Sequence, residues 1–269
     1  MSSQDKNEIR LGDVLIRQDA GVVWATLDRP KVVNALNDGL VEGLEQTLNL
    51  ARKSDAILVV LRGAGGNFCA GADLKYVSTL YADLEGGLFH YIDRLHAICD
   101  ELAEGPFISL AVIEGYALAG GYEILTACDL AVSTANASIG DRHLEYALAP
   151  GLGASVRIAS HLSAKRSRYL AYSGEIVSGT EAAAWGLVSH AWDAGMFEEK
   201  VAGLISRLAS RSKEAVRSYK RMLLRAEREP FDVAISLEKT AFREYQSKHA
   251  DARKGVERFT KKSGRNDKK

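Results

Sequence analysis

The chain has 269 residues, 46% of them hydrophobic, and its 35 basic and 35 acidic side chains leave a formal net charge of zero. This length and composition suffice for a full hydrophobic core in one large domain or two small ones. The balanced charge argues against a general nucleic-acid or membrane-surface binder, and no apolar run approaches the ~20 residues that cross a membrane.

Strand-like and helix-like segments alternate along the first two thirds of the chain. Two strands flank a turn at residues 19–21, and Asn37 can cap a helix whose apolar residues recur at helical spacing. This alternation indicates a layered α/β core with parallel strands. Strands are predicted at residues 13–17, 21–27, 57–62, 107–113, 129–133 and 137–139, and helices over about 38–52, over 79–104 and from about 119.

The last third of the chain has a different pattern. From Ser163 onward the periodicity is helical, with long amphipathic stretches over residues 195–227 and 230–262 and few strand signals. We therefore expect a core over residues 1–195 and a helical region over residues 196–269. The last nine residues carry five basic groups and one acid, which is typical of a solvated tail.

The cysteines and the N-terminus both favour a cytoplasmic location. Cys69, Cys99 and Cys128 show no paired spacing, as expected for reduced thiols in a cytosolic enzyme. Residues 1–10 are polar and lack the apolar segment of a signal peptide, so we expect a frayed N-terminus.

Two glycine-rich segments carry the chemistry. Residues 67–75 read NFCAGADLK and residues 111–129 read AVIEGYALAGGYEILTACD, and in each a strand-like run leads into small residues that let the backbone approach a ligand. The second segment places Glu123 just after Gly120-Gly121. N–H groups at a helix N-terminus can stabilise an enolate oxygen while a neighbouring carboxylate moves a proton, which is what a thioester enzyme needs.

Other ligand motifs are absent. GAGGNF at residues 63–68 has Phe68 where the dinucleotide fingerprint requires glycine, and Gly121 stands where a phosphate-binding loop requires lysine. There is no G-x-S-x-G nucleophile turn, and the six histidines do not cluster at metal-ligand spacing. The sequence therefore predicts neither a nucleotide triphosphate site nor a metal.

Across nearly its whole length the chain resembles the enoyl-CoA hydratase/isomerase (crotonase) superfamily. The matching segments are LDRPKVVNAL (27–36), FCAGADLK (68–75), EGYALAGGYEILTACDLAV (114–132), LAPG (148–151) and EAAAWGLV (181–188), in the family's order and spacing. The resemblance implies an α/β fold, a crotonase-like spiral of ββα units, with a C-terminal helical trimerisation region. It also implies a homotrimer or a homohexamer made of two trimers.

The resemblance further implies an acyl-CoA substrate, so that coenzyme A arrives with the substrate and no cofactor is tightly bound. The thioester carbonyl would accept hydrogen bonds from the N–H groups of Ala72 and Gly120, which form an oxyanion hole. Ala35, Ala70 and Leu74 are implied near the nucleotide end of coenzyme A, with Lys31, Phe259 and Lys262 as weaker candidates for contacts with the adenine and phosphates.

The second catalytic position departs from the hydratase pattern. Typical hydratases grip one water with two glutamates, and the first of these matches Glu123. Counting back from Pro150, the second position holds His143. A neutral imidazole, with an ordinary pKa of about 6.5, can act as acid or base near neutral pH. Simple isomerisation is disfavoured, because the family's single-glutamate isomerases keep the glutamate that is missing here.

Our leading hypothesis is an enoyl-CoA hydratase that adds water reversibly across C2–C3, with Glu123 as the main acid–base residue and His143 assisting. The alternatives are another enolate-forming reaction and carbon–carbon bond hydrolysis of a β-keto or β-diketone substrate. The family's diketone hydrolases also have histidine at this position, but an aspartate nine residues on orients it. Here that position is Leu152, and Asp141 and Glu145 are substitutes out of register.

A third hypothesis belongs to another class, a binding protein that contacts RNA through the basic tail. The zero net charge and the lack of a helical stripe of lysine and arginine argue against it.

Overall fold

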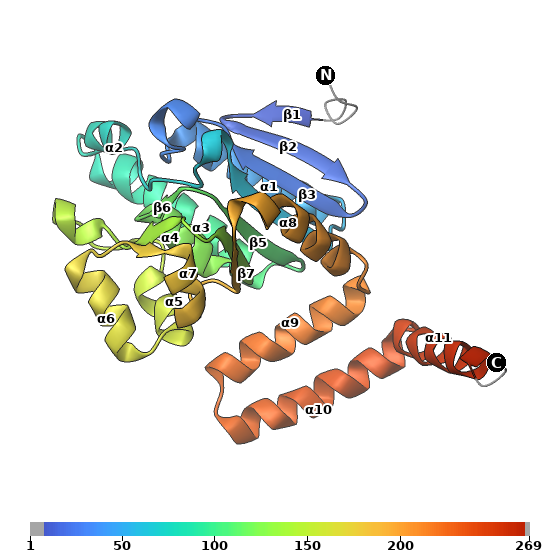
Figure 1. The fold of residues 1–269 in the computed structure, drawn as a ribbon. Helices are drawn as coiled ribbons and strands as arrows, with labels where there is room; N and C mark the ends of the chain where they lie inside the picture. The colour runs from blue at the N-terminus through green and yellow to red at the C-terminus, as the bar shows by residue number, and fades with distance from the viewer. Residues whose placement is uncertain (1–7, 267–269) are drawn as a thin grey trace. The chain divides into compact units, whose positions relative to one another are not determined.

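The computed structural model describes the backbone of residues 8–266 and the side chains of residues 8–261 (Figure 1). The chain forms two compact units, Met1–Ala209 and Ser210–Lys269. The expected division at residue 195 remains a prediction, and helix α8 (Ala194–Ala209), which begins there, belongs to the first unit. The expectations for the extreme N-terminus, for the last three residues and for the Lys262 side chain fall outside the described residues.

A seven-stranded sheet in the order β1-β2-β3-β4-β5-β7-β10 forms the centre of the first unit. Strands β1 to β3 are antiparallel neighbours, and every pairing from β3 to β10 is parallel. Residues 58–61 are buried without alternation, because central parallel strands are covered on both faces. The strands are β1 (Glu8–Leu11), β2 (Val14–Asp19), β3 (Val22–Leu27), β4 (Leu58–Gly63), β5 (Ile108–Ile113), β7 (Leu130–Thr134) and β10 (His190–Trp192).

A smaller sheet brings the ends of successive chain segments together. It consists of β6 (Tyr116–Leu118), β8 (Ser138–Gly140) and β9 (Val177–Ser178), with β6 parallel to β8 and Leu118 opposite Gly140. Two isolated bridges extend it, pairing Cys69 with Ala117 and Leu36 with Ala72. The residues that follow these strands therefore meet at one edge, which is where the candidate site lies.

The helices of the first unit include those predicted from the sequence, and two others, α2 (Leu74–Leu80) and α5 (Ala154–His161), were not predicted. Asn37 caps α1 as expected, its side chain accepting the Leu40 N–H at 3.0 Å. The expected helix over residues 79–104 is interrupted, because the Asp83 side chain accepts the Gly86 N–H at 3.0 Å and restarts the helix. The elements are α1 (Asp38–Lys53), α2 (Leu74–Leu80), a π-helical turn (Leu84–Phe89), α3 (His90–Glu104), α4 (Gly120–Ala127), α5 (Ala154–His161), α6 (Ala164–Ser173) and α7 (Gly179–Trp185), with 3₁₀ turns at Pro30–Val32, Ala64–Gly66 and His143–Tyr146.

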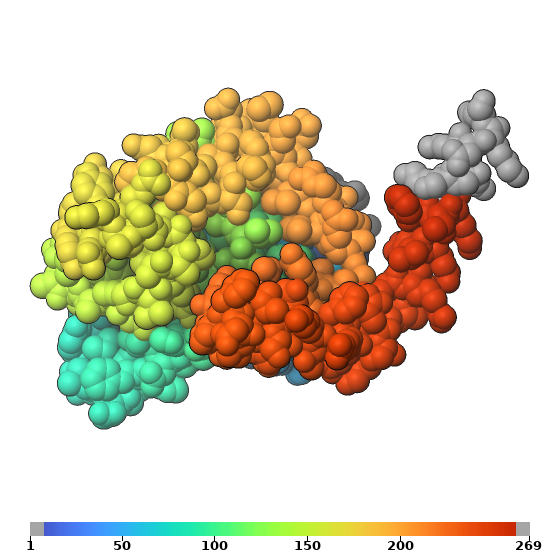
Figure 2. Space-filling model, turned by 90° about the horizontal axis from the view of Figure 1, so that it is seen from below, coloured from blue at the N-terminus to red at the C-terminus, as the bar shows by residue number. Residues whose placement is uncertain are grey.

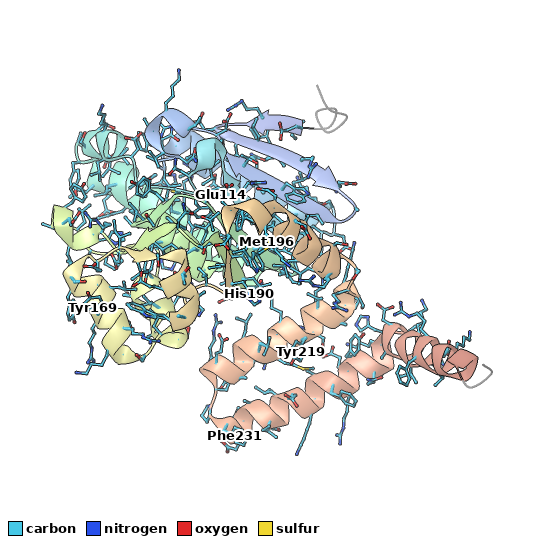
Figure 3. The ribbon with its side chains drawn as sticks, in the orientation of Figure 1. Glu114, Tyr169, His190, Met196, Tyr219 and Phe231 are labelled. Atoms are coloured by element: carbon cyan, nitrogen blue, oxygen red, sulfur yellow. The ribbon has the colours of Figure 1, made fainter. Side chains whose placement is uncertain are left out.

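The second unit is helical, as predicted. It contains α9 (Lys213–Arg228), α10 (Phe231–Lys248) and α11 (Asp251–Asn266), and Pro230 separates the first two. Large apolar side chains stand exposed on it, among them Tyr219 and Phe231 (Figure 3). Among the described residues, no helix is both long and apolar enough to cross a bilayer.

Candidate active site

The N–H groups of Ala72 and Gly120 border one small space. Gly120 opens α4, and Ala119 before it has the unusual dihedral angles φ 45° and ψ −117°. A Cβ built on Gly120 would lie 3.4 Å from the Cα of Gly71 and 3.5 Å from the Ala72 nitrogen. Within the described part of the chain, neither N–H has a protein acceptor. Both donors are thus available to a ligand, with the positive end of α4 behind one of them.

Glu123 lies in the first turn of α4 and is only 1% exposed. Its Oε1 accepts the N–H of Leu152 at 2.8 Å and the N–H of Ala154 at 3.3 Å. Its Oε2 lies 3.3 Å from Nε2 of His143. A buried carboxylate needs partners, and these contacts fix one oxygen while directing the other toward the histidine.

His143 bridges two carboxylates. Its Nδ1 lies 2.6 Å from Oδ1 of Asp141, and the same oxygen accepts the backbone N–H of His143 at 3.1 Å. Burial lowers the pKa of His143, but the hydrogen bonds and charges of Asp141 and Glu123 outweigh burial and raise the pKa to about 9. At neutral pH the ring is therefore an imidazolium that donates both N–H groups, one toward each carboxylate.

A cavity of about 290 Å³ adjoins Asp141 and His143. Asp141 and His143 line it together with groups from α5 and α6, but Glu123 does not. The groups from α6 include Arg168 and Tyr172, and Leu144 and Pro150 also line the cavity.

Cys69 lies next to the candidate oxyanion hole but is unsuited to nucleophilic attack. It is fully buried, and burial raises the pKa of its thiol to about 12. A thiol rather than a thiolate is therefore present at neutral pH, and only the thiolate is an effective nucleophile.

Ala35, Ala70 and Leu74, which were also expected near coenzyme A, belong to segments next to Ala72. The Ala70 N–H donates to the Val33 carbonyl at 2.9 Å, so the strand-like segments that hold Ala35 and Ala70 run side by side. Lys31 is exposed in a 3₁₀ turn. Leu74 is 41% exposed at the start of α2, which contributes to a teal lobe at one end of the surface in Figure 2. Their contact with coenzyme A remains a prediction.

Comparison with known proteins identifies the family. The sequence model described as enoyl-CoA hydratase/isomerase matches residues 17–266. The chain belongs to the enoyl-CoA hydratase/isomerase family. The crotonase resemblance is thereby confirmed.

Relatives and solved structures agree with this assignment. The chain is 36% identical over 175 residues to human "enoyl-CoA hydratase domain-containing protein 2, mitochondrial". The aligned residues cover 64% of this chain and 59% of that protein. It is 27% identical over 238 residues to the short-chain-enoyl-CoA hydratase of Clostridium acetobutylicum, covering 88% and 90% of the two chains. The crystal structure of an enoyl-CoA hydratase from Bacillus anthracis superposes with a TM-score of 0.86 at 28% identity, over 93% of this chain and 96% of that one. The expected crotonase fold is confirmed.

For this family member, the structure brings together the four residues predicted as catalytic in two pairs, Ala72 with Gly120 and Glu123 with His143. Sequence reasoning underrated Asp141, because it expected the acid that orients His143 nine residues further along the chain, where Leu152 stands. In the structure an Asx-type turn folds the Asp141 side chain back onto the histidine two residues later. The D-x-H spacing was the available signal.

The N–H donors to Glu123 were missed altogether. They are backbone groups of a turn 29 to 31 residues further along the chain, and side-chain identity gives no sign of them. Glu145, the other acid considered as a partner of the histidine, pairs instead with Arg142.

Proposed function

We propose that this protein catalyses the reversible hydration of a 2-enoyl-CoA. The observation that carries the proposal is the pairing of the buried Glu123 with His143, whose side chains lie 3.3 Å apart. Glu123 belongs to α4, and the first N–H of this helix, that of Gly120, borders the space shared with Ala72. The hydratase names of the related proteins support the same reaction. Coenzyme A is part of the substrate, and the assembly is a homotrimer or homohexamer.

In this mechanism Glu123 is the base and His143 the acid. Two N–H donors hold Oε1 of Glu123, which leaves Oε2 to take a proton from water as the water oxygen attacks C3. The N–H groups of Ala72 and Gly120 stabilise the negative charge on the thioester oxygen. The imidazolium of His143 then protonates C2 through Nε2.

The pair resets by one direct transfer. After the addition, Glu123 carries the proton from water and His143 has lost one, and their atoms lie 3.3 Å apart. Passing the proton from Oε2 to Nε2 restores both groups. Asp141 holds Nδ1–H throughout, so the imidazole keeps the orientation that places Nε2 beside Oε2 of Glu123.

The test is to follow loss of the 2-enoyl absorbance with crotonyl-CoA and with longer or aryl enoyl-CoAs. Turnover to the 3-hydroxyacyl-CoA supports the proposal. If these substrates bind without turning over while a β-keto thioester is cleaved to a free acid, the enzyme is a carbon–carbon bond hydrolase instead.

Activity should depend on pH through His143. Because the pKa of about 9 exceeds the ~6.5 of an unfolded chain, the acid form predominates at neutral pH and kcat/KM should fall as the pH rises through about 9. The imidazolium's contribution to the free energy of unfolding is fully present below ~6.5 and is lost over the same rise. Asp141→Asn removes one negative partner, so this alkaline limb should move to lower pH in kcat/KM profiles.

The matched control is Asp19→Asn, which neutralises an exposed acid at the end of β2. Its profile should overlay that of the wild type. An alkaline limb that stays in place in Asp141→Asn would show that another group titrates there.

His143→Ala should lower kcat by about 10²-fold, since the general acid is lost while Glu123 remains. The cavity that adjoins His143 has a volume of about 290 Å³ and would enlarge with the truncation. Added imidazole should bind there and restore part of the activity in a saturable way. Imidazole should leave Glu123→Gln unchanged, and full activity of His143→Ala without imidazole would remove His143 from the mechanism.

A further inference from the structure

The turn that holds Glu123 is itself anchored from outside. The N–H groups of Leu152 and Ala154 point at the Glu123 carboxylate, and Gly153 between them has a φ of 93°, a conformation that favours glycine. These donors are in place only while the turn keeps this shape. A carboxylate by itself does not dictate the conformation of a loop, so other contacts must set it.

Arg157 on α5 supplies those contacts. Its Nη1 donates to the Leu152 carbonyl, and its Nη2 donates to Oδ1 of Asp100 on α3 at 2.6 Å. The Arg157 side chain is 17% exposed. The guanidinium is a planar fork with fixed donor directions, so it ties the turn to α3 at a defined distance.

A second group on α3 acts on the adjoining peptide. His96 Nδ1 lies 3.2 Å from the Gly151 carbonyl, and its Nε2 lies 3.6 Å from Asp100. The peptide that joins Gly151 to Leu152 thus contacts α3 through its carbonyl and Glu123 through its N–H. Since a peptide group is planar, fixing one end of it orients the other.

We propose that Arg157 is a positioning residue for Glu123: anchored by Asp100, it holds the turn whose N–H groups orient the catalytic carboxylate. The expected effect of Arg157 on kcat rests on the proposed function, whereas its expected effect on the conformation of the turn does not. Without the anchor, Oε1 loses its fixed donors and Oε2 no longer aims at one position of the water. Substrate binding, which involves other segments, is spared.

The kinetic experiment compares Arg157→Met with Arg157→Lys and a control. Arg157→Met should lower kcat by roughly 10- to 100-fold, the scale of a displacement of about 1 Å at a catalytic group, while KM for the enoyl-CoA changes less than about 3-fold. Arg157→Lys keeps a donor and should recover part of the loss.

The control is Arg94→Met. Arg94 is similarly buried, with 22% of its side chain exposed, and pairs with Glu45 at 2.7 Å and Asp38 at 2.6 Å to join α3 to α1. Its loss should lower the melting temperature but leave kcat nearly unchanged. If kcat falls in proportion to the melting temperature in both variants, Arg157 is only a structural ion pair and the proposal is wrong.

A second readout is independent of activity. Amide hydrogen exchange of Leu152 and Ala154 should accelerate in Arg157→Met and stay at the wild-type rate in Arg94→Met. If the wild type does not hydrate enoyl-CoA, the proposed function fails while this measurement still decides on the anchor; unchanged exchange overturns the anchor itself. Should Arg157→Met fail to fold, Asp100→Asn, which weakens the anchor and leaves Arg157 in place, should show the same changes to a smaller degree.

Discussion

Glu123→Gln should lower kcat for enoyl-CoA hydration by roughly 10³-fold or more, toward the upper part of the range for general acid–base catalysis. The amide cannot take the proton of water and cannot return one to His143. It keeps the size of the carboxylate, and its carbonyl can still accept the N–H groups of Leu152 and Ala154. The variant should therefore fold and bind CoA thioesters while failing in the chemical step.

Loss of the 2-enoyl absorbance measures this effect, with thioester binding and the melting temperature measured alongside. Glu145→Gln is the matched control, because Glu145 lies two residues from His143 but pairs with Arg142. It should remain active. Full activity of Glu123→Gln on a true substrate would falsify the assignment of the base.

Gly120→Ala should lower kcat by roughly 10²- to 10³-fold, the effect of losing one oxyanion-hole donor. The added methyl group would lie 3.5 Å from the Ala72 nitrogen and 3.1 Å from a Leu36 methyl group, in the space where the thioester oxygen is proposed to bind. It would therefore occupy part of the space in front of the Ala72 N–H. The Leu36 methyl group can shift to relieve its contact, whereas the Ala72 nitrogen belongs to the backbone and has less freedom to move.

The control for this variant is Gly195→Ala in α8, where an added methyl group meets nothing within 4 Å. It should keep wild-type kcat, as measured by the same absorbance assay. Gly120→Ala should also lose affinity for an enolate-like ligand more than for free coenzyme A. Equal turnover of Gly120→Ala and the wild type would show that the thioester oxygen binds elsewhere.

Local patterns predicted most of the core. The continuous apolar runs of β4, β5 and β7 and the cap of α1 by Asn37 are each encoded within a few residues, and all were found close to the predicted places. The strands that were not predicted are short or lie at edges, as in β1, β6, β9 and β10. Two to four residues carry too little periodicity to be distinguished from a loop.

The pairing of Glu123 with His143 was accessible from the sequence only through the family pattern. Counting from Pro150 placed His143 opposite Glu123, and the structure shows these side chains in contact. The partner of the histidine was judged by register along the chain, and that rule was misleading. A two-residue Asx turn brings Asp141 to Nδ1, whereas Leu152, at the expected register, serves Glu123 through its backbone N–H.

The sequence by itself indicated the α/β class, the helical C-terminal region and the small residues around Ala72 and Gly120, because these depend on local composition and spacing. The family pattern added Glu123 and His143 as candidate acid–base residues. Only the tertiary structure shows that the pKa of His143 is raised and which groups orient Glu123. The pKa of His143 is raised by Asp141, two residues away, and by Glu123 on α4, and the turn that donates to Glu123 contacts Arg157 and α3. Electrostatic and hydrogen-bonding effects act over a few ångströms in space, and only folding sets those distances.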